Sequence, residues 1–140
     1  MWCLLLFMIV ASTSADYPLY IDELEDLVTG PDRRLLKTLD KNKNLPRTEL
    51  KSQFEEILAR QSQSVQDMFS RVVELEEMQR AAKVARESEK AQGLGVGDVY
   101  KQILAVEGDL SLSKNEAKRE ERTLERQLGR GWNSASSEEN

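Results

Sequence analysis

Residues 44–51 read NLPRTELK, and residues 111–118 repeat the same pattern as SLSKNEAK. In both stretches a leucine, Leu45 or Leu112, is followed four residues later by a glutamate. In the second stretch, Ser113 and Glu116 have the spacing of a capping box, in which the serine oxygen accepts from the N3 amide and the glutamate accepts from the serine amide. Both stretches are therefore predicted to start a helix, and the predicted fold is organised around them.

A short apolar helix is predicted before each of these stretches. Leu36 and Leu39 precede the first stretch. The offset that takes Leu45 to Leu112 also takes these two residues to Ile103 and Val106, before the second stretch. The repeat unit is therefore a helix, a polar loop and a second helix, and the chain uses it twice.

Between the two copies, residues 65–92 carry the longest helical pattern of the chain. Met68, Phe69, Val72 and Leu75 recur at spacings of three and four residues, as on one face of a helix. We therefore predict an all-α fold: a single helical domain of five to six helices, in which two pseudo-repeated helix-loop-helix halves are joined by a long helix.

Three positions distinguish the two copies or mark further helix starts. Pro46 replaces the serine of the capping box in the first copy, so we expect Asn44 to cap the third helix. We expect Asp98 to cap the fifth helix, because it follows a glycine-rich stretch. Glu121 stands in the second copy where the first copy has Phe54, so the last helix is expected to be thinly anchored.

The two ends of the chain differ in composition from the helical body. Residues 2–10 are an unbroken apolar run, followed by small and polar residues up to Ala15, as in a secretory signal peptide. The run is shorter than the roughly 20 apolar residues of a membrane span. We predict a signal peptide over residues 1–15, a helical domain over residues 16–128 and a disordered acidic tail over residues 129–140, and hence a secreted, extracellular product.

The chain has no histidine and a single cysteine, Cys3, which lies in the predicted signal peptide. The processed protein is therefore expected to lack a thiolate nucleophile, a histidine base and the ligands of a structural zinc site, and we expect no enzymatic activity. The formal net charge of −5 argues against a general nucleic-acid binder, which needs a basic face. We expect neither nucleic acid nor a membrane span among the interactions of this chain.

The loop of the first repeat has oxygen-bearing side chains at alternate positions. Asp40, Asn42 and Asn44 match positions 1, 3 and 5 of a calcium-binding EF-hand loop. Position 6 is Leu45 instead of glycine, and position 12 is Lys51 instead of a bidentate glutamate, which argues against a high-affinity EF-hand. Aspartate and asparagine are also typical of helix stops and turns, and the sequence leaves both interpretations open.

A weak cation site is the functional hypothesis for this loop. Its candidate metal ligands are Asp40, Asn42, Asn44 and Glu49, with Glu49 folding back from the first turn of the next helix. Such an all-oxygen set suits calcium or magnesium, but only two of its groups are anionic. We therefore expect a dissociation constant of about 10⁻⁴–10⁻³ M, as in extracellular calcium modules.

The two turns, the predicted signal peptide and the cysteine-free helical body also carry a family resemblance. Residues 42–50 and 109–116 resemble the paired turns of the SXP/RAL family of secreted nematode proteins, which includes Anisakis-allergen-like cation-binding domains. Pro46 and Glu121 depart from the family pattern. The resemblance implies an all-helical secreted domain, a calcium or magnesium site and antigenicity in parasites.

Two functions from different classes follow from these observations. The first is a secreted, non-enzymatic binding protein with a weak divalent-cation site and an antigen-like character, with an unidentified extracellular protein as a further partner. The alternative is an extracellular carrier of small apolar ligands such as fatty acids. The residues expected to line such an apolar cavity are Phe54, Met68, Phe69, Val72 and Tyr100.

Overall fold

The computed structural model describes residues 20–129, and these residues form six helices. The predicted signal peptide over residues 1–15 and the tail from residue 130 onward lie outside the described residues. The helices are α1 (Ile21–Leu27), α2 (Gly30–Lys41), α3 (Arg47–Ala59), α4 (Gln63–Gly93), α5 (Gly97–Gly108) and α6 (Lys114–Leu128). None of them is long and apolar enough to cross a membrane.

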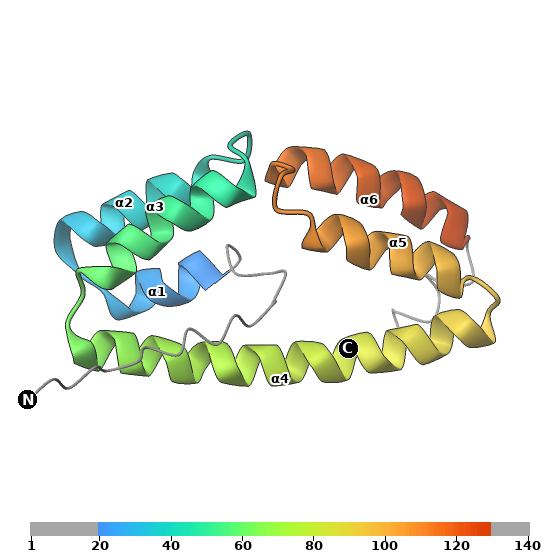
Figure 1. Ribbon diagram of the computed structural model, residues 1–140, viewed down its shortest axis with the longest axis horizontal. Helices are drawn as coiled ribbons and strands as arrows, with labels where there is room; N and C mark the ends of the chain where they lie inside the picture. Colours follow the sequence, from blue (N-terminus) through green and yellow to red (C-terminus); the bar gives the residue numbers. More distant parts are fainter. Residues whose placement is uncertain (1–19, 130–140) are drawn as a thin grey trace, which may run out of the picture.

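The six helices are arranged as two groups on one long helix (Figure 1). Helices α1, α2 and α3 lie at the amino-terminal end of α4, and α5 and α6 fold back from its carboxyl-terminal end. The α2–α3 loop and the α5–α6 loop meet above the middle of α4, which closes the chain into a ring (Figure 1). The predicted all-α domain, with two helix-loop-helix halves joined by a long helix, is therefore confirmed.

The first half holds the larger hydrophobic core. Phe54 of α3 is fully buried and packs against Phe69 of α4, with ring centroids 5.5 Å apart. Aromatic pairs at this distance add to the stabilisation from buried apolar area. The buried members of this core are Tyr20, Ile21, Leu24, Val28, Leu36, Leu39, Leu50, Phe54, Ile57 and Phe69.

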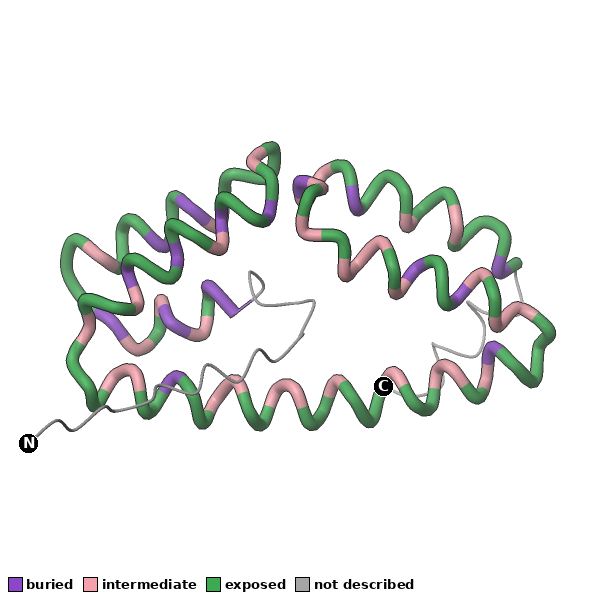
Figure 2. The backbone as a smooth tube through the Cα atoms, viewed as in Figure 1, coloured by how far each residue is buried: buried purple, intermediate pink, exposed green. Residues whose placement is uncertain are grey.

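The second half buries fewer large side chains, and Figure 2 shows how little of α5 and α6 is buried. Tyr100 and Ile103 of α5 and Ala117 and Leu128 of α6 are the buried apolar residues of these two packed helices. Glu121 is only partly buried, at the position where the first half has the fully buried Phe54. The second half is therefore built on a smaller core, which leaves space beside α4.

The helix starts agree with the predicted capping box and contradict two predicted caps. The Ser113 hydroxyl accepts from the Glu116 amide at 3.3 Å, and Glu116 Oε2 accepts from the Ser113 amide at 2.9 Å. The N-cap positions of α3 and α5 are Pro46 and Val96, and neither has a side-chain cap.

The two predicted caps are wrong because their side chains have other roles. The Asn44 side-chain oxygen accepts from Asn115 in the other half, at 2.6 Å, instead of capping α3. Asp98 lies inside the first turn of α5, because that helix begins at Gly97, and it forms an ion pair with Lys101.

Candidate functional site

The two loops of the repeat contact each other through backbone hydrogen bonds. Pro46 and Ser113 form an isolated antiparallel β-bridge, and they occupy equivalent positions in the two copies of the repeat. The Thr48 amide donates to the Leu110 carbonyl at 2.9 Å, and the Asn115 amide donates to the Lys43 carbonyl at 3.0 Å. The repeat offset exchanges these two bonds, so an approximate twofold relation links the halves in space.

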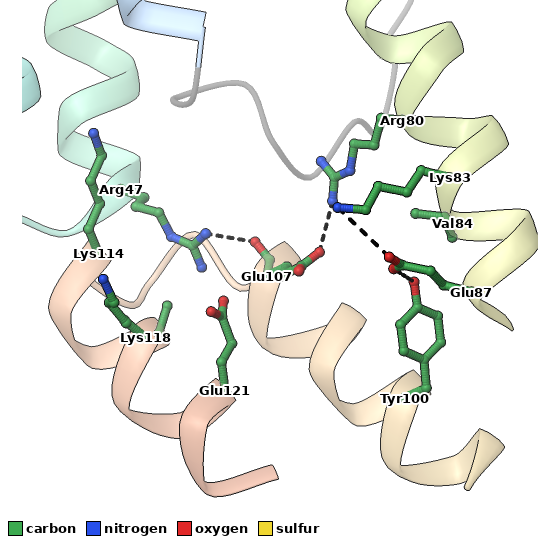
Figure 3. A pocket seen from close by; sticks show the side chains of 11 residues that line it. Arg47, Arg80, Lys83, Val84, Glu87, Tyr100, Glu107, Lys114, Lys118 and Glu121 are labelled. Carbon is green, nitrogen blue, oxygen red and sulfur yellow. Dashed lines mark hydrogen bonds and ion pairs between the residues drawn. The ribbon is translucent and has the colours of Figure 1, made fainter. Parts of the chain in front are cut away.

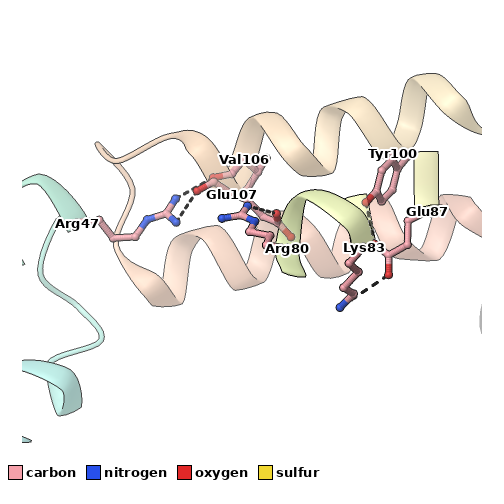
Figure 4. A network of polar contacts seen from close by, with 7 residues as sticks. All are labelled: Arg47, Arg80, Lys83, Glu87, Tyr100, Val106 and Glu107. Carbon is pink, nitrogen blue, oxygen red and sulfur yellow. Dashed lines mark hydrogen bonds and ion pairs between the residues drawn. The ribbon is translucent and has the colours of Figure 1, made fainter. Parts of the chain in front are cut away.

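Arg47, the first residue of α3, binds the end of α5 in the other half. Its side chain is buried, and its guanidinium donates to the carbonyls of Val106, Glu107, Asp109 and Leu112 at 2.7–3.2 Å. The last carbonyls of a helix have no partner within the helix and carry partial negative charge. Arg47 therefore caps α5 across the junction, as Figure 4 shows.

Lys114, the first residue of α6, makes the equivalent contact in the opposite direction. Its ammonium donates to Asp40 Oδ1 at 2.7 Å and lies 3.5 Å from the Asp40 carbonyl, at the end of α2. Each half thus supplies one basic side chain that binds the carboxyl-terminal end of a helix in the other half. The Arg47 guanidinium and the Lys114 ammonium therefore connect the two loops.

The sequence interpretation did not single out Arg47 and Lys114, although the sequence carries a signal for them. Both occupy the first position of a helix, where the helix dipole favours acidic residues. A basic residue at this position in both copies of the repeat indicates that another interaction outweighs the repulsion by the helix dipole. In the folded chain, this interaction is the contact of each side chain with the other half.

The predicted metal ligands lie in or beside this junction, and three of them have protein partners. Asp40 binds Lys114, the Asn44 oxygen accepts from Asn115, and Glu49 accepts from Gln53 at 3.5 Å. Asn42 lines a separate hollow between α2 and α3. Within residues 20–129, acidic, histidine and cysteine side chains nowhere gather in a group of three that could hold a metal ion. The cation site stays a prediction.

A polar cavity of about 530 Å³ lies beside Arg47, between α4, α5 and α6 (Figure 3). This volume lies within the range of small-molecule sites. Five of its lining side chains are cationic and three are acidic. The lining residues are Arg47, Arg80, Lys83, Val84, Glu87, Tyr100, Glu107, Lys114, Ala117, Lys118 and Glu121.

Two of the three acids in this cavity have cationic partners. Glu107 forms an ion pair with Arg80 at 3.1 Å, and Glu87 lies 3.8 Å from the Lys83 ammonium. The Tyr100 hydroxyl donates to Glu87 at 2.7 Å. Burial, and then this hydrogen bond, raise the pKa of Tyr100, so the phenol stays a neutral donor.

The remaining charges of the cavity lie on α6. Burial, and then the neighbouring Glu107 and Glu125, raise the pKa of Glu121, because these surroundings disfavour its charged form. Lys118, one turn earlier on the same helix, forms no ion pair within 4.0 Å in the part of the chain that the structure describes. The attraction of Arg47 and Lys118 partly offsets this rise in the pKa of Glu121, so Glu121 is the acid that faces Lys118 electrostatically. With five cationic and three acidic side chains, the cavity has a surplus of positive charge.

The residues expected to form an apolar cavity are spread over the molecule. Phe54 and Phe69 fill the first core, Met68 is 50% exposed, and Tyr100 lines the polar cavity. Val72 is partly buried on α4. The described residues thus place this set in different surroundings, and the carrier function stays a prediction.

Comparison with known proteins leaves the family open. No family model, no curated protein and no solved structure matches the chain. The resemblance to the SXP/RAL family therefore stays a prediction, and function has to be inferred from the chemistry of residues 20–129.

Proposed function

We propose that this protein is a non-enzymatic binding protein that takes a small anionic ligand, a carboxylate or a phosphate, into the polar cavity. The observation that carries the proposal is the surplus of cationic side chains around a cavity of about 530 Å³. Cationic side chains facing a partly desolvated space attract anions more strongly than the same charges in water.

The lining residues differ in what they offer such a ligand. The Arg47 guanidinium donates to four backbone carbonyls, so its position at the edge of the cavity is fixed. Lys118 forms no close ion pair among the described residues, so a ligand gains its charge without breaking one. Tyr100 is committed to Glu87, which keeps one side of the cavity in a defined geometry.

A titration with citrate, followed by heteronuclear NMR, tests this proposal. We expect saturable shifts in the amides of α6 and of the facing part of α4. Lys118→Gln is expected to weaken binding about tenfold, the effect of losing about 1.4 kcal/mol of interaction. The matched control is Lys101→Gln, which removes an exposed lysine outside the cavity. Equal loss in both variants, or no saturable shifts, would refute the cavity as the site.

Divalent-cation binding at the first loop is a second candidate function. The observation that favours it is that Asp40 already binds a cationic group, the Lys114 ammonium, at 2.7 Å. Calcium or magnesium would compete with Lys114 for this carboxylate and recruit oxygens from Asn42, Asn44 and Glu49. Competition with an internal cation keeps the affinity in the weak range of about 10⁻⁴–10⁻³ M.

Calorimetric titration with calcium and magnesium chloride tests the cation hypothesis. Lys114→Met is expected to strengthen binding, because it frees Asp40, and Asp40→Ala is expected to abolish it. Asp98→Ala, at an exposed acid away from the loops, is the control. If no heat is released by wild type or Lys114→Met at millimolar metal, Asp40 serves only as the partner of Lys114.

We also propose that the protein is exported from the cell. The support for this proposal is the apolar run at residues 2–10, which is typical of a signal peptide. Amino-terminal sequencing of protein collected from the medium is expected to begin at or next to Asp16. Protein that remains inside the cell with Met1 intact contradicts export.

A further inference from the structure

One face of α4 is exposed along the whole helix. Figure 2 shows exposed residues on the side of α4 that faces away from the other five helices. The large apolar side chains on this face are unusually accessible: Met68 is 50% exposed, Leu75 60% and Met78 65%. Leu75 and Met78 are three residues apart and therefore neighbours on this face, and adjoining exposed apolar side chains indicate an interaction surface.

The exposed positions have the spacing of a coiled-coil seam. Successive members are three and four residues apart, which is the heptad pattern of positions a and d. The apolar members of this set extend from Met68 to Ala85, over about two and a half heptads, and the polar members are Arg71, Glu89 and Gln92. Its members, all exposed, are Met68, Arg71, Leu75, Met78, Ala82, Ala85, Glu89 and Gln92, called the outer seam below.

The outer seam is asymmetric in side-chain size. Its first half holds three large apolar residues, whereas its second half holds Ala82 and Ala85. If two copies of α4 pair in opposite directions about residue 80, Met78 faces Ala82 and Leu75 faces Ala85. Large side chains then fill the space beside small ones, as close packing requires. Parallel pairing would place alanine opposite alanine and leave gaps.

The charges on α4 have the same asymmetry. Arg80, Lys83 and Glu87 line the cavity and do not take part in such a pair. The exposed charges next to the outer seam are Asp67 and Glu74 in the first half of α4 and Arg86 in the second half. Antiparallel pairing brings the exposed acids of each helix next to the exposed Arg86 of the other. In the register centred on residue 80, Arg71 also faces Glu89, so the one cation and the one acid of the outer seam meet.

We propose that the outer seam binds a second copy of this chain, as an antiparallel α4–α4 pair across a twofold axis. The side-chain sizes in the outer seam and the charges along α4 each favour pairing with a second copy in the antiparallel orientation. Polar residues at seam positions set the register and direction of coiled coils. Helices α5 and α6 and the loop junction lie on the other side of α4 (Figure 1). The cavity, which these two helices line together with α4, therefore stays accessible in such a dimer.

Sedimentation velocity over a range of protein concentrations tests the dimer. We expect a concentration-dependent shift from monomer to dimer in the wild type. Leu75→Glu is expected to weaken the dimer by at least about tenfold while leaving the circular dichroism spectrum unchanged, since Leu75 is exposed. Leu35→Glu, which places the same charge at an exposed leucine on α2, is the control. A wild type that stays monomeric up to about 1 mM overturns the proposal.

Charge exchange tests the orientation. Arg71→Glu is expected to weaken the dimer, because it places two acids opposite each other, and Glu89→Arg is expected to weaken it for the converse reason. The double variant is expected to restore the wild-type dissociation constant. In a parallel dimer each residue faces the same residue of the other copy, so the single variants are expected to leave the affinity unchanged. That result refutes the antiparallel register. A double variant that fails to restore the wild-type dissociation constant refutes it as well.

Discussion

At the scale of the residue, Arg47 connects the two halves most strongly. Its buried guanidinium donates four hydrogen bonds to carbonyls at the end of α5 and in the loop after it. Hydrogen bonds to a charged group contribute about 1.5–3 kcal/mol each, and buried carbonyls left without donors add a penalty. Lys114, its counterpart, binds a carboxylate that is half exposed, where ion pairs contribute little.

The first prediction compares these two equivalent residues. Arg47→Ala is expected to lower the free energy of unfolding by about 3 kcal/mol, and Lys114→Ala by about 1 kcal/mol or less. Urea denaturation measures both, with Lys101→Ala as an exposed control. Equal losses at Arg47 and Lys114 would mean that burial of the guanidinium adds nothing to the junction.

Glu121 is the residue that makes the halves unequal, because it replaces the core phenylalanine of the first half by a carboxylate. The pKa of Glu121 lies above its ordinary value of 4.5, so the folded state binds the proton more tightly than the unfolded state. Its stabilising contribution is present below the unfolded pKa and is lost as the pH rises through the folded pKa.

The second prediction follows from this sign. Glu121→Gln is expected to raise the melting temperature at about pH 7, where the wild type holds a disfavoured charge, and to have little effect at about pH 3.5. Thermal denaturation at the two pH values measures the difference. Glu120→Gln, at an exposed position next to it, is the control. A stabilisation that does not depend on pH would assign the effect to packing.

At the scale of the element, the start of α6 depends on its capping box. Hydrogen bonds from the Ser113 amide, and then from its side chain, lower the pKa of Glu116, so this stabilisation is lost as the pH falls through that lowered value. The serine also takes part in the bridge to Pro46, which couples the cap to the loop junction.

The third prediction concerns this cap. Ser113→Ala is expected to cost about 1 kcal/mol of stability, measured by urea denaturation. Ser62→Ala is the comparison, because Ser62 caps α4 through a longer bond of 3.4 Å at an exposed site. If Ser113→Ala leaves the unfolding midpoint unchanged, the box contributes nothing to α6.

At the scale of the whole molecule, the two halves of the ring differ in the size of their hydrophobic cores, and hence in stability. The first half carries ten buried core residues, whereas α5 and α6 bury only a few and border the polar cavity. Elements with few buried apolar contacts open at lower free energy than the core. The loop junction joins the less stable half to the more stable one.

The fourth prediction uses hydrogen exchange to measure this difference. Amides of α2, α3 and the first turns of α4 are expected to exchange most slowly, and those of α5 and α6 faster. Arg47→Ala is expected to speed exchange at the end of α5 and to leave α1 and α2 unchanged. Uniform acceleration across all helices would show that the halves unfold as one unit.

The helices and the repeat could be predicted from the amino-acid sequence alone. Periodic apolar residues and the Ser113–Glu116 box are local signals, because helix formation and capping depend on neighbours a few residues away. The offset between the two copies even predicted which positions correspond, and the bridge between Pro46 and Ser113 joins two such positions.

The contacts between the two loops could not be predicted from the sequence and are seen only in the folded chain. Arg47 and Lys114 meet partners that are far away in the chain, in the opposite half, and no local spacing encodes such a contact. Asn44, which was predicted to cap a helix, instead accepts a hydrogen bond from Asn115 in the other half. Glu121 lines the cavity. Charge and hydrogen-bond partners depend on distance in space, which for this chain is set when the ring closes.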